Sequence, residues 1–223
     1  GRMTQEIVAQ LDRDAFEVTV FSYPGDGDEV SRRIEAAAEH VQVLPDGFWE
    51  ARETIANAGM DILFFTDLGM DVRTYFLAFG RLAPVQCVTW GHPDTTGIPN
   101  VDTFLSSVLM EPADAQAQYS ERLHLLDTLP TCYRRPAAPA PKTRDDFGFS
   151  AGAHIYLCPQ MAIKFHPDLD RAVGRILAAD GRGEVVFLEG AVPHWTQAVM
   201  ARMAETIPDV VRRVRLIPRV APD

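Results

Sequence analysis

Residues 85–97 read VQCVTWGHPDTTG, and they join an apolar run to a loop rich in glycine, proline and hydroxyl groups. The run from Val85 to Trp90 predicts a β-strand, because continuous apolar residues bounded by turn residues are typical of a strand buried on both faces. The stretch from Gly91 to Gly97 predicts a loop at the carboxyl end of that strand. Strands of this kind belong to parallel sheets that helices cover on both sides.

The same pattern repeats on either side of this stretch. We expect further strands at residues 17–23, 41–44, 61–65, 101–107 and 123–126, alternating with helices at 3–11, 28–38, 48–58, 72–79 and a short one at 112–119. A second alternation has strands at 155–158, 185–188 and 214–217, a helix with Pro167 at its first position, and a helix at 195–207. The sequence therefore predicts an α/β fold made of two Rossmann-like parallel-sheet units.

A Pro- and Ala-rich segment separates the two alternations. We assign 1–134 to an N-terminal half, 135–145 to an extended linker, and 146–223 to the start of a C-terminal half. The chain opens inside a helix with no strand before it and stops soon after a strand. We therefore expect both units to be incomplete, as in the central part of a longer protein.

Composition narrows the classes of function. Of the 223 residues, 47% are hydrophobic and 23% charged, and the formal net charge is −10. An acidic chain repels phosphate backbones, so nucleic acid is not expected as the main partner. No apolar stretch is long enough for a membrane span, and the N-terminus does not resemble a signal peptide. The three sparse cysteines, Cys87, Cys132 and Cys158, indicate reduced thiols and a cytoplasmic protein.

Ligands of open α/β sheets bind beyond the carboxyl ends of the strands. In the loop after Trp90, Gly91 lets the backbone approach a ligand, and the Thr95 and Thr96 hydroxyls are possible donors to phosphate or sugar oxygens. The alternative is a tight turn in which Asp94 caps and the threonines bond locally. His92 is either a catalytic group or a structural histidine.

Three more strand ends carry candidate residues. Lys164 follows the strand at 155–158 and is suited to a diphosphate, the alternative being a solvated surface lysine. His166 either enters the next helix or contacts a ligand. Glu189 is a base, a ribose contact or a turn residue, and nothing assigns a role to Arg219. The sequence lacks the motifs of dinucleotide dehydrogenases, P-loop NTPases, α/β-hydrolases and zinc hydrolases.

The run LAPVQCVTWGHP from Leu82 to Pro93, continued by Thr96-Gly97, resembles the O-linked N-acetylglucosamine transferase and SPINDLY family, glycosyltransferase family 41. Further similar segments follow in the same order: Val101-Asp102, Phe104–Ser107, Tyr119–Leu123, Cys158–Gln160 and Lys164–Pro167. The resemblance covers nearly the whole chain. It implies a GT-B fold, in which two Rossmann-like halves face each other.

The resemblance also implies an activity and a site. The activity is inverting, metal-independent transfer of a sugar, typically GlcNAc from UDP-GlcNAc, to Ser or Thr of a protein. Lys164 matches the lysine that contacts the donor diphosphate, Gly91 and Pro93 match the loop near the donor sugar, and His92 stands where relatives carry His or Tyr. The predicted site comprises the catalytic residues Lys164 and His92 and the donor-binding residues Gly91, Pro93, Thr95, Thr96, Gln160 and Lys164.

The expected partners are a nucleotide-sugar donor and a protein or peptide acceptor, with no metal, other cofactor, nucleic acid or membrane. Relatives often carry tetratricopeptide repeats upstream. Met161 stands where animal enzymes carry a donor-contacting glutamine, so the base stays open. Alternatives are a GDP-fucose or asparagine-directed transferase, an enzyme acting on a small molecule or glycan, and a non-catalytic interaction module. We expect these 223 residues alone to be inactive.

Overall fold

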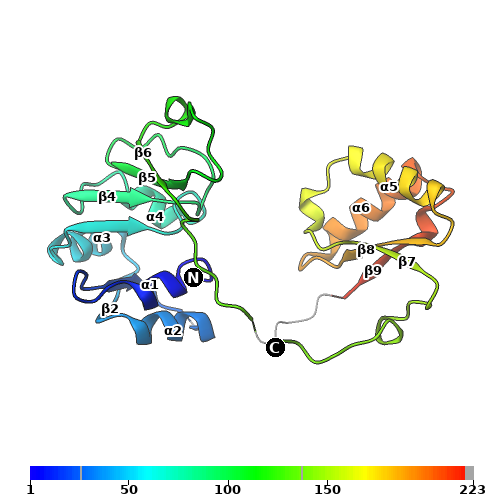
Figure 1. Ribbon diagram of the computed structural model, residues 1–223, viewed down its shortest axis with the longest axis horizontal. Coiled ribbons are helices and arrows are strands. Elements are labelled where there is room, and N and C mark those ends of the chain that lie inside the picture. Colours follow the sequence, from blue (N-terminus) through cyan, green and yellow to red (C-terminus); the bar gives the residue numbers. More distant parts are fainter. Residues whose placement is uncertain (26, 137, 219–223) are drawn as a thin grey trace. The chain divides into compact units, whose positions relative to one another are not determined.

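The computed structural model describes residues 1–25, 27–136 and 138–218, so Arg219 lies outside the described residues. The chain forms two compact units, Gly1–Ala137 and Ala138–Asp223. The division between them falls inside the range 135–145 that the sequence assigns to a linker. Each unit is described by itself (Figure 1). None of the helices in the described ranges is long and apolar enough to cross a membrane.

The N-terminal unit contains two parallel sheets. In the larger sheet, β3 (Ile62–Phe65), β4 (Val85–Val88), β5 (Thr103–Ser107) and β6 (Arg122–Leu126) are neighbours in that order. The smaller sheet pairs β1 (Thr19–Ser22) with β2 (His40–Val43). The helices are α1 (Gln5–Gln10), α2 (Glu29–Ala37), α3 (Phe48–Asn57) and α4 (Val72–Leu77). The predicted alternation of helices and strands is confirmed.

One predicted element has a different geometry. The short helix expected at 112–119 is a 3-10 helix, η1 (Ala115–Gln118), because a four-residue run after Pro112 is too short for the α-helical hydrogen-bond pattern. The two sheets also share no strand pairing within the described residues, whereas one continuous sheet would be typical of a Rossmann-like unit. They share a core instead, since Phe21 and Tyr23 pack against the cluster that includes Leu63 and Phe65.

The C-terminal unit is a three-stranded parallel sheet with the order β7 (His154–Cys158), β8 (Gly183–Leu188), β9 (Val214–Ile217). Helices α5 (Asp168–Ala179) and α6 (Pro193–Thr206) lie on one side of it (Figure 1). Alternate residues of a strand share a face, so Val185 and Phe187 both pack in the core cluster with residues of α5 and α6. Pro167 is the N-cap of α5, one position before the expected one.

The opposite face of that sheet is contacted by the segment before β7. The side chain of Arg215 on β9 donates to the carbonyl oxygens of Phe147 and Gly148, and its guanidinium lies 4.3 Å from the centre of the Phe149 ring. Phe147 ends the 3-10 helix η2 (Asp145–Phe147). The segment after the predicted linker is therefore fastened to the C-terminal unit.

A buried glutamine joins the amino ends of β4 and β5. Gln86 is fully buried; its Oε1 accepts from the Leu82 N–H, and its Nε2 donates to the carbonyl oxygens of Gly80 and Asn100 at 3.1 and 2.6 Å. A buried backbone group that loses its partner costs about 1–3 kcal/mol. The side chain of Gln86 therefore stabilises the turns on both sides of β4.

We expect Gln86→Ala to lower the free energy of unfolding of the N-terminal unit by about 3 kcal/mol, because it leaves one buried and two partly buried backbone groups without their partner. Urea unfolding in a Trp195→Phe background measures this through the fluorescence of Trp49 and Trp90. Gln118→Ala, at an exposed glutamine of the same unit, is the matched control and should change stability by less than about 0.5 kcal/mol. Equal effects of the two changes would contradict the role of Gln86.

The loop after β4 lies directly on the loop after β3. A Cβ atom on Gly91 would come within 2.5 Å of the Thr66 carbonyl oxygen and 2.9 Å of the Asp67 Cα. Both neighbours are backbone atoms, which cannot move aside cheaply. On the β3 side, Gly69 has a φ of +89°, and a Cβ there would lie 3.0 Å from the Cβ of His92. Glycines at these two positions therefore allow the carboxyl-end loops to pack closely.

Gly91→Ala is expected to destabilise the N-terminal unit by about 1–3 kcal/mol, because the added methyl group forces the two loops apart. The same urea titration measures the change. Gly25→Ala serves as the control, since a Cβ at Gly25 would meet no heavy atom within 4 Å. An unchanged midpoint for Gly91→Ala would show that the loops separate without cost.

Candidate functional site

His92 lies at the carboxyl edge of the larger sheet, beside the loop that follows β3. It lines a hollow of about 230 Å³ formed by Leu68, Gly69, Tyr75, Val88, His92, Asp94, Thr95 and Thr96. Its side chain is about 43% exposed, and its Nδ1 accepts a long hydrogen bond of 3.4 Å from the Asp94 N–H. In the neutral ring that accepts this bond, Nε2 carries the proton. The Asp94 carboxylate lies 3.6 Å from the same Nδ1, so the other tautomer, with the proton on Nδ1 and a free Nε2, also has a partner.

Sequence reasoning missed Asp67 and Tyr75 at this edge. Burial raises the pKa of the Asp67 carboxyl, and the charge of Asp71 raises it further. Tyr75, on the first turns of α4, lines the hollow with His92. An acid immediately after the apolar strand at 61–65 is a signal that could have identified Asp67, because strand ends gather functional groups. Nothing in the sequence around Tyr75 distinguishes it from other aromatic residues of α4.

The chain after β4 must return to the other edge of the sheet, because β5 runs parallel to β4 and begins at the amino edge. The connection contains no helix. Thr95 and Thr96 therefore lie on the returning arm, next to Ser120 and Glu121, which precede β6. This differs from the sequence-based picture, in which the whole loop sits beyond the carboxyl end of the strand.

Glu121 holds the two threonines. Its carboxylate accepts from the Thr95 hydroxyl at 2.7 Å, from the Thr96 N–H at 2.8 Å, and from the Thr96 hydroxyl. The Ser120 hydroxyl accepts from the Gly97 N–H. Glu121 is 2% exposed, and although burial raises its pKa, the hydrogen bonds from Thr96 and Thr95 outweigh burial and hold the pKa below the usual value. The threonine hydroxyls are thus used within the fold, and their contact with a donor stays a prediction.

The carboxylate of Glu111 fixes the first part of the loop, where the chain leaves β4. The indole Nε1 of Trp90 donates to the Ser106 hydroxyl at 3.0 Å, and Ser106 donates to Glu111 at 2.6 Å. The Tyr119 hydroxyl donates to the same Glu111 oxygen at 2.8 Å. Burial and then this hydrogen bond raise the pKa of Tyr119 to about 12. The residues Gly91 to Asp94, which include His92 and Pro93, therefore bridge two fixed points.

Lys164 lies at the carboxyl end of β7, in the C-terminal unit. It ends the 3-10 helix η3 (Ala162–Lys164), between the buried side chains of Ala162 and Phe165. The Lys164 side chain is exposed and has no ion pair or side-chain hydrogen bond within the described residues. Gln160, also exposed, accepts from the Met161 N–H through its own side chain at 3.0 Å. The turn presents Lys164 to solvent and to any anion that approaches this edge.

An ion pair between a buried carboxylate and a half-buried arginine fixes this turn. Asp170 on α5 is fully buried, and Arg202 on α6 donates to both of its oxygens, at 2.8 and 2.9 Å. Arg202 also donates to the carbonyl oxygen of Phe165, adjacent to Lys164. His166 precedes α5 and accepts through Nδ1 from the N–H of Asp168, the first residue of that helix, while its contact with a ligand stays a prediction.

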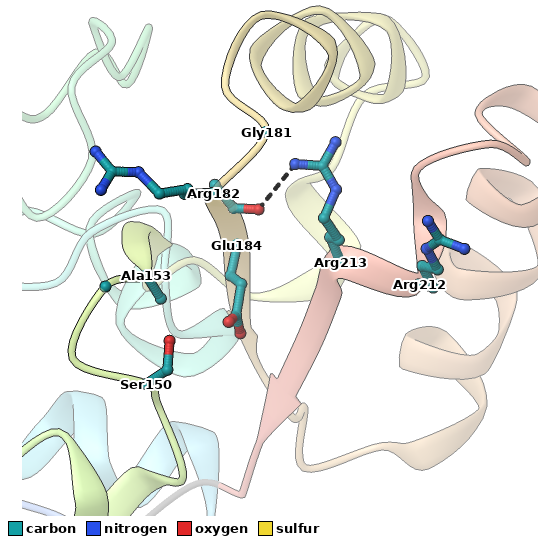
Figure 2. Close-up of a pocket in the computed structure, with 9 residues that line it drawn as sticks. Ser150, Ala153, Gly181, Arg182, Glu184, Arg212 and Arg213 are labelled. Atoms are coloured by element: carbon teal, nitrogen blue, oxygen red, sulfur yellow. Dashed lines mark hydrogen bonds between the residues drawn. The ribbon is translucent and has the colours of Figure 1, made fainter.

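A second hollow lies at the amino edge of β7, β8 and β9. It measures about 480 Å³ and is lined by Ser150, Gly152, Ala153, Gly181, Arg182, Gly183, Glu184, Arg212 and Arg213. Figure 2 shows the side chains of Arg182 and Arg212 pointing away from each other, while Arg213 donates to the Gly183 carbonyl oxygen. These charges do not converge on one point, and Lys164 lies at the opposite edge.

The predicted residues thus form two groups. Gly91, His92, Pro93, Thr95 and Thr96 share one loop of the N-terminal unit. Gln160 and Lys164 share one turn of the C-terminal unit. Among the described residues, no group of three or more His, Cys, Asp or Glu side chains could hold a metal ion.

No protein-family profile matches the chain. A protein of Arabidopsis thaliana named probable UDP-N-acetylglucosamine–peptide N-acetylglucosaminyltransferase SPINDLY is 38% identical over 149 residues, which is 63% of this chain and 15% of that protein. A UDP-glucose:protein N-β-glucosyltransferase of Actinobacillus pleuropneumoniae is 35% identical over 98 residues, 42% of this chain and 15% of that protein. The chain therefore spans about 15% of the length of these curated relatives.

The fold has a solved counterpart. A structure of an O-GlcNAc transferase mutant from Thermobaculum terrenum superposes with a TM-score of 0.78 at 22% identity, covering 99% of this chain and 42% of the other. The parallel-sheet units described above are therefore of the GT-B kind. In sequence, the chain is thus similar to part of proteins named SPINDLY and UDP-glucose:protein N-β-glucosyltransferase, and in fold to part of a solved O-GlcNAc transferase.

Proposed function

We propose that the protein containing this chain is a glycosyltransferase that moves a sugar from a nucleotide donor to a protein acceptor. The donor we propose is UDP-GlcNAc and the acceptor a Ser or Thr hydroxyl. The observation that carries the proposal is Lys164, an exposed lysine without an anionic partner in the described residues, fixed at the carboxyl end of β7 by buried neighbours. Its context in a relative of named protein glycosyltransferases makes a donor diphosphate the ligand that fits it.

The proposed chemistry uses two groups of the chain. The acceptor hydroxyl oxygen forms a bond to the anomeric carbon of the sugar, while the bond from that carbon to the diphosphate oxygen breaks and inverts the configuration. His92 takes the proton from the hydroxyl at Nε2 in the tautomer whose proton is on Nδ1, with the Asp94 carboxylate oxygen 3.6 Å from that nitrogen. Lys164 stabilises the negative charge that develops on the departing diphosphate. The reaction as proposed needs no metal ion.

A specific observation favours a second candidate. One of the relatives is named a UDP-glucose:protein N-β-glucosyltransferase, and its 98 matched residues are 35% identical to this chain. In this alternative the donor is UDP-glucose and the acceptor an asparagine amide. The two candidates share the roles of Lys164 and His92, and they differ in the sugar and in the acceptor atom.

Lys164→Ala in the full-length protein should lower turnover by a factor of about 10² to 10³ and abolish detectable UDP binding in calorimetric titration. Lys142 is the other of the two lysines in the sequence, and Lys142→Ala is the matched control, expected to keep both properties. Wild-type turnover in Lys164→Ala would refute the proposed role. Binding of GDP in preference to UDP would indicate fucosyl transfer, and binding of neither would indicate a non-catalytic module.

The donor and acceptor are tested together by mass spectrometry of peptides after incubation with the full-length protein. We expect a GlcNAc adduct on Ser or Thr with UDP-GlcNAc. A hexose adduct on asparagine with UDP-glucose would replace this assignment by the second candidate. We also propose that the 223-residue chain alone is inactive, and sugar transfer by that chain would contradict this part of the proposal.

A further inference from the structure

The segment between β5 and β6 supplies both carboxylates that hold the loop after β4. Glu111 follows β5 and holds Trp90 through Ser106, while Glu121 precedes β6 and holds Thr95 and Thr96. The two glutamates lie on either side of η1. One short segment therefore fixes both arms of the loop that carries His92.

The Glu121 anchor is the stronger of the two. Its carboxylate accepts from one backbone N–H and two hydroxyls, while the side chain is 2% exposed. Hydrogen bonds to a charged acceptor are stronger than those between neutral groups, and burial keeps water from replacing them. Within the described residues, Glu121 has no salt-bridge partner, so the loop itself supplies the compensation for its buried charge.

The part of the loop between the anchors has little support of its own. The backbone N–H of Asp94 reaches His92 only at 3.4 Å, and Pro93 and Asp94 are exposed. The position of the His92 ring therefore depends on where the two arms are held and on the close approach of Gly69 and Gly91 to their neighbours.

We propose that Glu121 is a positioning residue, which sets the location of His92 by fastening Thr95 and Thr96 through its ionised carboxylate. In this arrangement the two threonine hydroxyls orient the loop and not the donor. Glu111 fixes the other arm in the same way. The consequence for turnover rests on the proposed function, whereas the consequence for loop order does not.

The test compares Glu121→Gln with Glu53→Gln, which removes the same charge from an exposed position on α3. In the full-length protein, Glu121→Gln should speed amide hydrogen exchange by about tenfold or more at residues 91–97, with exchange in β3 unchanged. The substituted side chain has an NH2 group in place of one carboxylate oxygen. The donors of Thr95 and Thr96 therefore lose an acceptor, and this end of the loop is bound less firmly. Glu53→Gln should leave the loop unchanged.

Measurements of turnover distinguish a loss of His92 positioning from a general loss of protein stability. Glu121→Gln should lower kcat by roughly tenfold to a hundredfold while UDP affinity stays within about twofold, because Lys164 lies in the other unit. Assays run well below the midpoint of thermal unfolding of each variant. Thr96→Val should give a similar loss, and the double variant should lose no more than the larger single one, as expected for residues that act as a unit.

The dependence of protein stability on pH tests independently whether the Glu121 carboxylate stabilises the loop. Because the pKa of Glu121 is lowered in the folded state, its contribution is complete above the unfolded value of 4.5 and declines as the pH falls from there through the folded pKa. Glu121→Gln should lack this component of the acid dependence in urea titrations at pH 3 to 6. Glu53→Gln should retain it.

The outcomes are distinguishable. Unchanged exchange at residues 91–97 in Glu121→Gln overturns the anchor. Faster exchange with unchanged kcat overturns the positioning role in catalysis, and additive effects of Thr96→Val and Glu121→Gln overturn the coupling between them. If the wild-type protein transfers no sugar, the proposed function fails, and the exchange and pH measurements still decide whether Glu121 fixes the loop.

Discussion

The parallel pairing of β4 with β5 is the constraint on which the N-terminal site depends. A parallel strand must begin at the edge opposite to the one where its predecessor ends, and here the chain makes that return without a helix. Such a loop has no regular backbone hydrogen bonds of its own, so its N–H and C=O groups need other partners. Glu121 and Ser120 supply the missing partners on the returning arm. The same groups that solve this folding problem also determine where His92 lies.

The C-terminal unit meets a similar requirement by different means. The turn after β7 is fastened by Phe165, whose ring packs 4.6 Å from that of Phe187, and by Arg202, which bonds the Phe165 carbonyl oxygen. The ion pair between half-buried Arg202 and buried Asp170 joins α5 to α6. Lys164 is consequently an exposed charge on a rigid support. Lys164 is exposed and His92 is partly exposed, while residues near each of them in sequence are fixed by buried groups.

Most of the elements could be predicted, whereas only part of the site could. Apolar runs such as Val85–Val88 and Val214–Ile217 identify strands because burial on both faces requires apolar side chains throughout. The rule of strand ends led to His92 and Lys164 at the carboxyl edges. It did not lead to Asp67, which belongs to a neighbouring strand end, and it did not show that Thr95, which lines the hollow with His92, is also bound by Glu121 on the returning part of the loop.

The sequence by itself determined the alternation of elements, their parallel pairing and the resemblance to known proteins, because periodicity and motif order are local properties of the chain. Only the tertiary structure decided which hydrogen-bond partner each polar side chain has. Glu121 follows Thr95 by 26 residues, and no local pattern shows that its carboxylate meets the Thr95 and Thr96 hydroxyls. That meeting follows from the positions of β4, β5 and β6 in one sheet. Hydrogen bonds form where the fold brings a donor and an acceptor within about 3 Å of each other. The spacing of residues in the sequence does not predict which groups come that close.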